Sequence, residues 1–84
     1  SENVIEQFTK KVAANIPQIK QVYKVNITMT EDGVGISVEI KALYGTNLRQ
    51  VAEELQKATI QLVEHLAGLN VLYVNVRIKN LHVK

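Results

Sequence analysis

The first segment of the chain carries apolar residues at helical spacing. They recur every three or four positions, which indicates an amphipathic helix over about residues 4–15. The predicted apolar stripe consists of Val4, Ile5, Phe8, Val12 and Ile16. Asn3 is expected to cap this helix, with Glu6 completing a capping box. Pro17 ends it, because proline disfavours a helical conformation in the residue before it.

The next two segments alternate apolar and polar residues, which is the period of a strand with one covered face. Strands are predicted over about residues 21–30 and 34–43. The apolar positions are Tyr23, Val25, Ile27 and Met29 in the first strand, and Val34, Ile36, Val38, Ile40 and Ala42 in the second. Asp32-Gly33 lies between the two runs and predicts a hairpin.

A second helix and a third strand complete the pattern. The helix is predicted from a cap at Thr46 or Asn47 to Ala67, with Gly68 ending it in a left-handed conformation. Its expected buried stripe is Leu48, Val51, Ala52, Leu55, Thr59, Leu62, Val63 and Leu66. The strand is predicted over about residues 71–79, with Leu72, Val74, Val76 and Ile78 on one side and Tyr73, Asn75, Arg77 and Lys79 on the other.

The order helix-strand-strand-helix-strand predicts an α+β fold. Both helices are expected on one face of a three-stranded sheet, as a two-layer sandwich, with residues 1–84 forming a single domain. The crossover from the second to the third strand should be right-handed. The third strand could lie beside the first or the second. We favour the first, which makes the sheet antiparallel throughout.

Composition narrows the class of protein. A hydrophobic content of 46% fits a packed core, and the lack of cysteine excludes disulfides and thiolate chemistry and fits a reducing compartment. A net charge of +2 is too balanced for a dedicated nucleic-acid binder. No apolar run approaches the roughly 20 residues that span a bilayer, so no direct membrane span is expected. Ser1 stands where an initiator methionine would be, so we expect a longer parent protein.

The sequence lacks the convergent groups that catalysis needs. His65 is placed near a helix C-terminus, where a cation is favoured, and His82 in the terminal tail, so neither indicates a Ser-His-acid site. Glu53 and Glu54 diverge by roughly 100° around the helix and cannot act as a paired acid and base. The histidines lack helical metal-binding spacing, and the Gly-Val-Gly stretch lacks dinucleotide-loop spacing. We therefore expect no enzyme activity, no metal site and no cofactor.

The polar side of the predicted sheet is the most informative surface. It should display four positive charges and one negative charge, and the residues singled out as a candidate interaction face are Lys24, Lys41, Tyr73, Asn75, Arg77 and Lys79. Sheets that bind RNA stack bases on two or three aromatic residues, and here Tyr73 alone is expected to face outward. The alternatives are a solvated face, a protein-binding face with Tyr and Arg anchors, and strand addition at a free sheet edge.

The stretch Tyr44-Gly45-Thr46-Asn47 forms a candidate helix-start loop. Backbone amides at a helix start could hold an anion, with Arg49 adding charge. A cap side chain normally satisfies such amides, and Gly45 is explained by a sharp turn out of the strand. We interpret the loop first as a structural joint and only second as a binding site.

The segments YGTNLRQVAEELQ and VEHLAGLNVLYVNVRI closely resemble the alkaline shock protein family of bacteria. The matching residues are Tyr44, Gly45, Asn47, Val51, Ala52, Gln56, Val63, Glu64, Gly68, Leu69, Val71, Val74, Asn75 and Val76. The chain departs from the family at Gln18 and Ile19, where Gly-Val is usual after the proline, and at Ala67, where Thr is frequent. It also lacks the short strand that commonly precedes the first helix.

This resemblance implies a non-enzymatic role in alkaline and cell-envelope stress. It implies a cytoplasmic protein that self-associates as a homo-oligomer. It also implies a protein partner, a small membrane-anchoring protein, through which the chain becomes membrane-associated. The family defines no catalytic residues, so the resemblance assigns none. The alternative function is an RNA- or anion-binding domain that uses the basic open sheet face, although the charge and the aromatic content disfavour nucleic acid.

Overall fold

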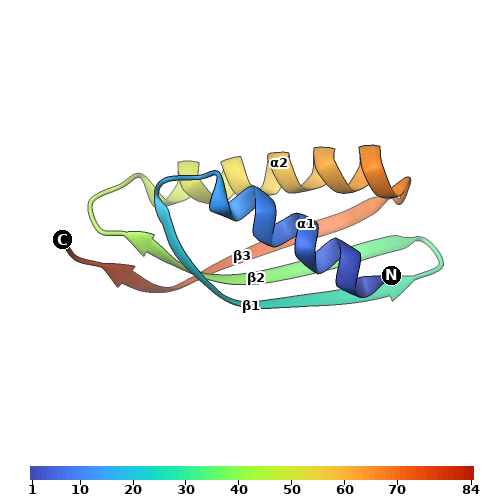
Figure 1. Ribbon diagram of the computed structural model, residues 1–84, viewed down its shortest axis with the longest axis horizontal. Helices are drawn as coiled ribbons and strands as arrows, with labels where there is room; N and C mark the ends of the chain where they lie inside the picture. The colour runs from blue at the N-terminus through green and yellow to red at the C-terminus, as the bar shows by residue number, and fades with distance from the viewer.

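The computed structural model describes all 84 residues and contains five elements. They are α1 (Glu2–Ala14), β1 (Ile19–Thr30), β2 (Gly33–Leu43), α2 (Leu48–Ala67) and β3 (Val71–His82). Both helices lie on one face of a three-stranded sheet, as Figure 1 shows. The predicted α+β two-layer architecture and its element order are therefore confirmed.

The strand order differs from the one that we favoured. β2 is the central strand, with β1 antiparallel on one side and β3 parallel on the other, so the prediction that β3 lies beside β1 is wrong. The reason lies in the apolar content of β2. Its five helix-facing residues are at most 1% exposed, and they are Val34, Ile36, Val38, Ile40 and Ala42. A strand with neighbours on both sides gives such a continuous apolar face its fullest burial.

Bulges interrupt the alternation that the sequence suggested. In β1 a register shift between Val22 and Lys24 leaves Tyr23 as an extra residue opposite β2. Two register shifts between β2 and β3 leave Leu72 and Lys79 as extra residues of β3. An extra residue changes the phase of a strand, so the side chains after it point differently from a strict period of two. Leu72, which was predicted in the core, is consequently exposed.

Helix α1 starts earlier than predicted. It begins at Glu2 with Ser1 at the cap position, and no side chain bonds to the free amides of its first turn. Asn3 and Glu6 lie inside the helix, so the predicted capping box is wrong. Glu6 instead forms an ion pair with Lys10 one turn later, at 2.8 Å. This exposed pair contributes only a few tenths of a kcal/mol.

Helix α2 has the caps that its sequence predicts. The Asn47 side-chain oxygen accepts a hydrogen bond from the Gln50 amide at 3.1 Å, which identifies Asn47 rather than Thr46 as the cap. At the other end Gly68 has φ +68°, a left-handed conformation that glycine adopts without steric cost, and its amide donates to Glu64 O. Both predicted ends of this helix are confirmed.

The core lies between the helices and the sheet. Its helical contribution is a narrow stripe on each helix, consisting of Ile5, Thr9, Val12 and Ala13 on α1 and Val51, Leu55, Thr59 and Val63 on α2. Val4 and Leu66, both predicted in the core, are exposed. Leu66 points into the space between the two helices rather than toward the sheet.

Two leucines of α2 test this division between core and surface. Leu55 is 0% exposed and Leu66 is 58% exposed. We expect Leu55→Ala to lower the free energy of unfolding by about 2–5 kcal/mol, because it leaves a cavity under the helix. Leu66→Ala, a matched change on the same helix, should lower it by less than about 1 kcal/mol. Urea denaturation followed by circular dichroism measures both, and equal losses would contradict the assigned core.

Candidate interaction face

The sheet face away from the helices, which we call the open face, brings together the residues predicted as a candidate interaction face. Pairing across the strands sets their positions. The rows that cross the open face are Lys24–Glu39–Arg77, Asn26–Ser37–Asn75 and Thr28–Gly35–Tyr73. Lys41 pairs with Asn80 further along the sheet, beside the bulge residue Lys79. The six predicted side chains therefore belong to one continuous surface.

The ring of Tyr73 lies over a glycine of the neighbouring strand. Gly35 pairs with Tyr73 in the register, and a Cβ atom at Gly35 would overlap the tyrosine ring. The missing side chain thus provides the space in which the ring sits. An aromatic residue over a cross-strand glycine is held in place by this contact, so the ring is positioned before any partner arrives.

The bulge in β1 adds a second tyrosine to this surface. Tyr23 was predicted on the apolar side, and that assignment is wrong. Asn80 Nδ2 contacts Tyr23 Oη at 3.5 Å, and the Lys79 ammonium lies 5.3 Å from the centre of the Tyr23 ring. Both partners come from β3, so the Tyr23 side chain reaches across β2. Ile40 and Ala42 fill the helix side of β2 there, which leaves the open face as its path.

The open face is predominantly positive. Arg77 Nη1 lies 3.8 Å from Glu39 Oε2, which neutralises the single carboxylate in this part of the sheet. None of the ion pairs in the chain involves Lys24, Lys41 or Lys79. Three lysines therefore present uncompensated charge beside the two tyrosines. Such a surface favours an acidic ligand over a basic one.

The candidate helix-start loop connects β2 to α2. The Tyr44 amide donates to His82 O at 2.8 Å, which ties the loop to the end of β3. Gly45 has φ +91°, a conformation that other residues rarely adopt, and the Thr46 hydroxyl donates to Leu43 O at 2.8 Å. These bonds close a tight turn on itself.

The start of α2 is already capped. The hydrogen bond from the Gln50 amide to Asn47 occupies a donor that a bound anion would use. Arg49 points to Glu53, at 3.9 Å on an exposed surface. The geometry of Tyr44, Gly45, Thr46 and Asn47 is thus that of a structural joint, and their role as a binding loop stays a prediction.

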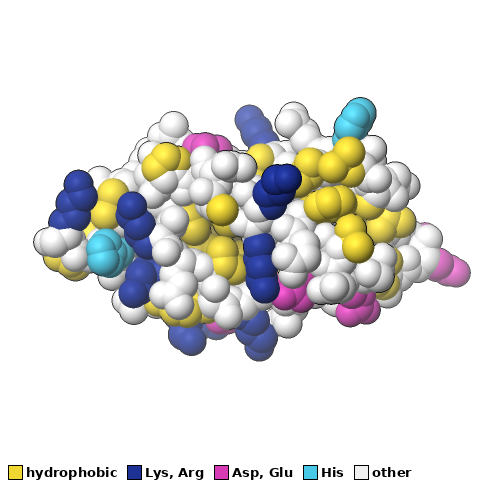
Figure 2. All heavy atoms as spheres, in the orientation of Figure 1, with side chains coloured by type: hydrophobic (Ala, Val, Ile, Leu, Met, Phe, Trp, Pro, Cys, Tyr) yellow, Lys and Arg dark blue, Asp and Glu magenta, His cyan; other side chains and the backbone are white.

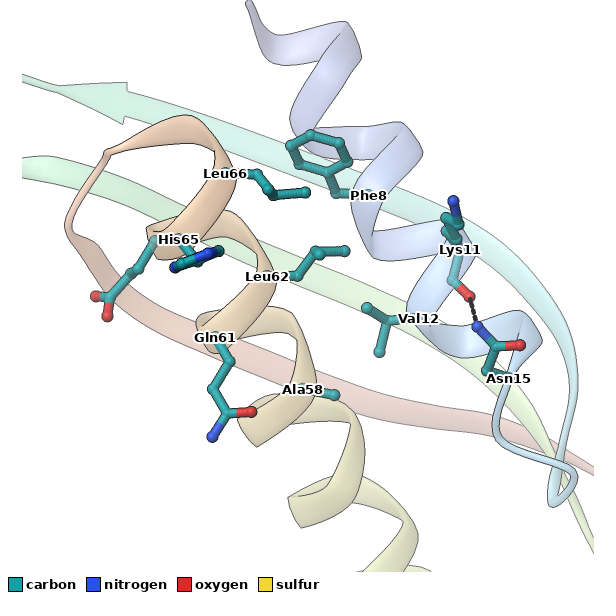
Figure 3. A pocket seen from close by; sticks show the side chains of 10 residues that line it. Phe8, Lys11, Val12, Asn15, Ala58, Gln61, Leu62, His65 and Leu66 are labelled. Carbon is teal, nitrogen blue, oxygen red and sulfur yellow. Dashed lines mark hydrogen bonds between the residues drawn. The ribbon is translucent and has the colours of Figure 1, made fainter.

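A groove between the two helices was not predicted. Phe8 and Val12 of α1 face Leu62 and Leu66 of α2 across it, as Figure 3 shows, and Ala58 of α2 also lines it. Its polar rim consists of Lys11, Asn15, Gln61, Glu64 and His65, and its volume is about 820 Å³. Figure 2 shows the apolar side chains gathered between the helices at one end of the molecule. The signal was the width of the two apolar stripes, which exceeds what three strands can cover.

The two histidines lie far apart. His65 lines the groove near the end of α2, whereas His82 is the last residue of β3 rather than part of a tail. β3 starts beside the end of α2 and runs to the opposite end of the molecule (Figure 1). Twelve strand residues span roughly 40 Å. The chain also contains no group of three His, Cys, Asp or Glu side chains that could hold a metal ion.

A family model matches almost the whole chain. The model of the alkaline shock protein family, described as having a cell envelope-related function, matches residues 2–83. The chain therefore belongs to this family, which confirms the resemblance that its residues indicate. No curated protein matches the sequence significantly. Neither helix combines the length and the apolar character that crossing a membrane requires.

Solved structures with the same fold include C-terminal domains of other proteins. A double variant of the MamM C-terminal domain has a TM-score of 0.76 at 11% identity, covering 94% of this chain and 93% of that one. The zinc form of another MamM variant has a TM-score of 0.78 at 10% identity, covering 94% and 85%. The metal-bound C-terminal domain of the CzcD transporter from Thermotoga maritima has 0.75 at 12%, covering 94% and 90%. At these identities the likeness shows the fold alone.

The contact between Tyr73 and Gly35 can be tested by a double-mutant cycle. Gly35→Ala should lower the free energy of unfolding by about 1–3 kcal/mol, because the added methyl group overlaps the ring. In a Tyr73→Ala background the same change should cost less than about 0.5 kcal/mol, since the ring is gone. Chemical denaturation of the four proteins measures this coupling. Equal costs in both backgrounds would show that the ring does not rest on Gly35.

Proposed function

We propose that this member of the alkaline shock protein family is a non-enzymatic protein-interaction module of cell-envelope homeostasis. It acts through protein contacts on the open face and through self-association. Its partner is a protein that presents an acidic segment. The family match supports the link to the cell envelope, and the open face supports the mode of action.

The observation that carries this proposal is the composition of the open face. It combines two tyrosines with Arg77 and three lysines that have no carboxylate partner, all on one face of the sheet. Tyrosine and arginine are the residues that most often supply binding energy at protein interfaces. The ring of Tyr73 is held by Gly35, so binding does not require it to be ordered. The face is thus ready to bind without rearrangement.

The charges define the chemistry of the partner. Lys24, Lys41 and Lys79 have no carboxylate partner in the chain, so an acidic segment would gain ion pairs without displacing existing ones. Long-range attraction would also speed the encounter. RNA is the other polyanion that a basic face could attract. The ammonium group of Lys79 already covers the Tyr23 ring, so only Tyr73 is free to stack on a base.

The absence of enzyme activity is part of the proposal. The imidazoles of His65 and His82 lie at opposite ends of the sheet, and Glu53 and Glu54 are consecutive exposed residues of α2. No two of these groups converge on a common point as a general acid and base would. The chemistry of the exposed side chains therefore favours binding over catalysis.

The proposed location is the cytoplasm, with attachment to the membrane through the partner. A small membrane-anchoring protein with an acidic cytoplasmic segment would suit the open face by charge. The fold also occurs as the C-terminal domain of a transporter in CzcD. By analogy, this occurrence of the fold in a transporter supports attachment of the domain to a membrane partner.

The open face is tested by removing its anchors. The variant Tyr73→Ala, Arg77→Ala, Lys41→Ala should weaken binding of the partner by at least about tenfold, since two hot-spot residue types and two positive charges are lost. The partner is first captured from the native cells with tagged protein, in the presence of nuclease, and identified by mass spectrometry. Its affinity for purified wild-type and variant proteins is then measured by calorimetry.

The matched control removes the same three residue types elsewhere. Tyr44→Ala, Arg49→Ala, Lys57→Ala changes the helix-start loop and α2 and should leave the affinity within about twofold. A loss in the control and not in the first variant would move the site to the helix-start loop. Unchanged binding in the first variant would disprove the open face as the site. If capture disappears with nuclease and the affinity falls steeply with salt, the partner is RNA rather than a protein.

A further inference from the structure

The backbone of β1 has a free hydrogen-bonding edge. The Val34 amide donates to Asn70 O at 2.8 Å, so the amide and carbonyl of Val34 point toward β3. Residue pairs in an antiparallel ladder alternate between hydrogen-bonded and non-hydrogen-bonded pairs. Met29 is paired with Val34 and therefore forms no backbone hydrogen bond with β2. Every second residue of β1 before Met29 likewise forms no backbone hydrogen bond with β2. The amides and carbonyls of Val25, Ile27 and Met29 consequently point outward from the sheet.

The outer edge of β3 is partly covered. Gln56 Nε2 donates to Val74 O at 2.9 Å, and Glu64 Oε2 accepts from the Val71 amide at 3.0 Å. Both side chains come from α2, which thus bonds to β3 at two points. No side chain of α1 bonds to the backbone of β1. Of the two edges, β1 is the one with its backbone groups available to another strand.

The apolar side of β1 is incompletely covered by α1. Val25 and Ile27 are half-buried and Met29 is 43% exposed, whereas the neighbouring residues of β2 are fully buried. Helix α1 therefore leaves the outer flank of β1 open. A second strand beside β1 could place its own apolar side chains against this flank, as neighbouring strands of a covered sheet do.

We propose that β1 pairs with β1 of a second copy of this chain, antiparallel and centred on Ile27. The stretch from Lys24 to Thr30 has no register shift, so it can pair over its full seven residues. Only the register centred on Ile27 uses all seven. It places Val25 opposite Met29 of the partner copy, apolar against apolar, and joins the outward backbone groups of both edges. Two sheets of three strands become one sheet of six.

Charge complementarity selects a second copy in this orientation. The first half of β1 carries Lys20 and Lys24, and the turn after the strand carries Glu31 and Asp32; all four residues are exposed. Antiparallel pairing brings the acidic turn of each copy beside the basic start of the other, twice per dimer. No like charges are directly opposed, because Lys24 faces Thr30 of the other copy. The edge is therefore complementary to itself.

This interface rests on the self-association included in the proposed function. Of the candidate interaction residues on the open face it uses Lys24, and it leaves Tyr73, Arg77 and Lys41 free. A dimer would place the two open faces side by side in one surface. The open-face variant described above should therefore still dimerise, so failure of one idea can be told from failure of the other.

Disulfide trapping tests the register. The chain has no cysteine, so introduced thiols are unique. In the proposed pairing Asn26 lies opposite Thr28 of the other copy, as a non-bonded pair with Cα atoms about 4.5 Å apart, within disulfide range. Identical residues would be about 7–8 Å apart, which is too far. Mixing Asn26→Cys with Thr28→Cys protein should form at least about tenfold more covalent dimer than either protein alone.

The control moves the same experiment to the other edge. Asn75→Cys mixed with Arg77→Cys has the same spacing on β3 and should not cross-link above the single variants. Cross-linking of the Asn26 and Thr28 variants that is equal in the mixture and in each protein alone would disprove the register. Stronger trapping at β3 would move the interface to the opposite edge and overturn the proposal.

A charge swap provides a second, non-covalent measurement. The double variant Asn26→Lys, Thr28→Lys places like charges opposite each other at two positions of the dimer interface. It should raise the dimer dissociation constant by about tenfold. Asn26→Lys with Thr28→Glu opposes unlike charges and should restore dimerisation. Sedimentation equilibrium measures both, with circular dichroism confirming that each protein is folded. A monomeric wild-type chain at about 1 mM, or equal effects of the two variants, would overturn the interface even if partner binding to the open face is intact.

Discussion

The structure depends on the burial of one face of β2. Val34, Ile36, Val38 and Ile40 have almost no contact with solvent, and they obtain this burial because two helices lie above them and a strand lies on each side. The intervening residues of β2 must then point to the opposite side, where no helix follows. A three-stranded sheet with both helices on one face leaves the other face for solvent or for a partner. The open face is thus a direct consequence of how the core is closed.

Small departures from regular pairing determine what that face displays. One extra residue in β1 transfers Tyr23 from the side of the core to the open face, and one in β3 places Lys79 against its ring. Gly35 has no side chain, and this leaves the space over β2 in which the Tyr73 ring lies. Each of these features costs regular strand geometry or packing, and each adds a positioned aromatic or cationic group to one surface. Their concentration on one surface is the feature on which the proposed interaction face rests.

Local signals in the sequence were sufficient for the elements but not for their arrangement. The alternation of β2, the Asn47 cap and Gly68 each act within a few residues, and the structure confirms them. Strand order depends on which strand buries most apolar surface when it has a neighbour on each side. This requires a comparison of distant segments, which the periodicity of any one segment does not contain. Bulges are equally hidden, because an extra residue changes the phase of a strand without changing its composition. The groove at Leu66 depends on the width of the sheet under the helices, which no single helix encodes.

Likeness of fold and likeness of function separate clearly in this molecule. The MamM and CzcD domains share its architecture at 10–12% identity, yet the proposed function depends on side chains that architecture does not specify. What the fold does supply is a three-stranded sheet with one uncovered face; side chains of α2 bond to its β3 edge, and its β1 edge is free. If two copies join at the free edge, their open faces become one surface with two equivalent sites. A partner that is itself dimeric, or clustered in a membrane, would then bind more tightly than to either site alone, because the second contact is intramolecular. Pairing at the free edge would in this way give a small domain two equivalent sites where a single copy has one.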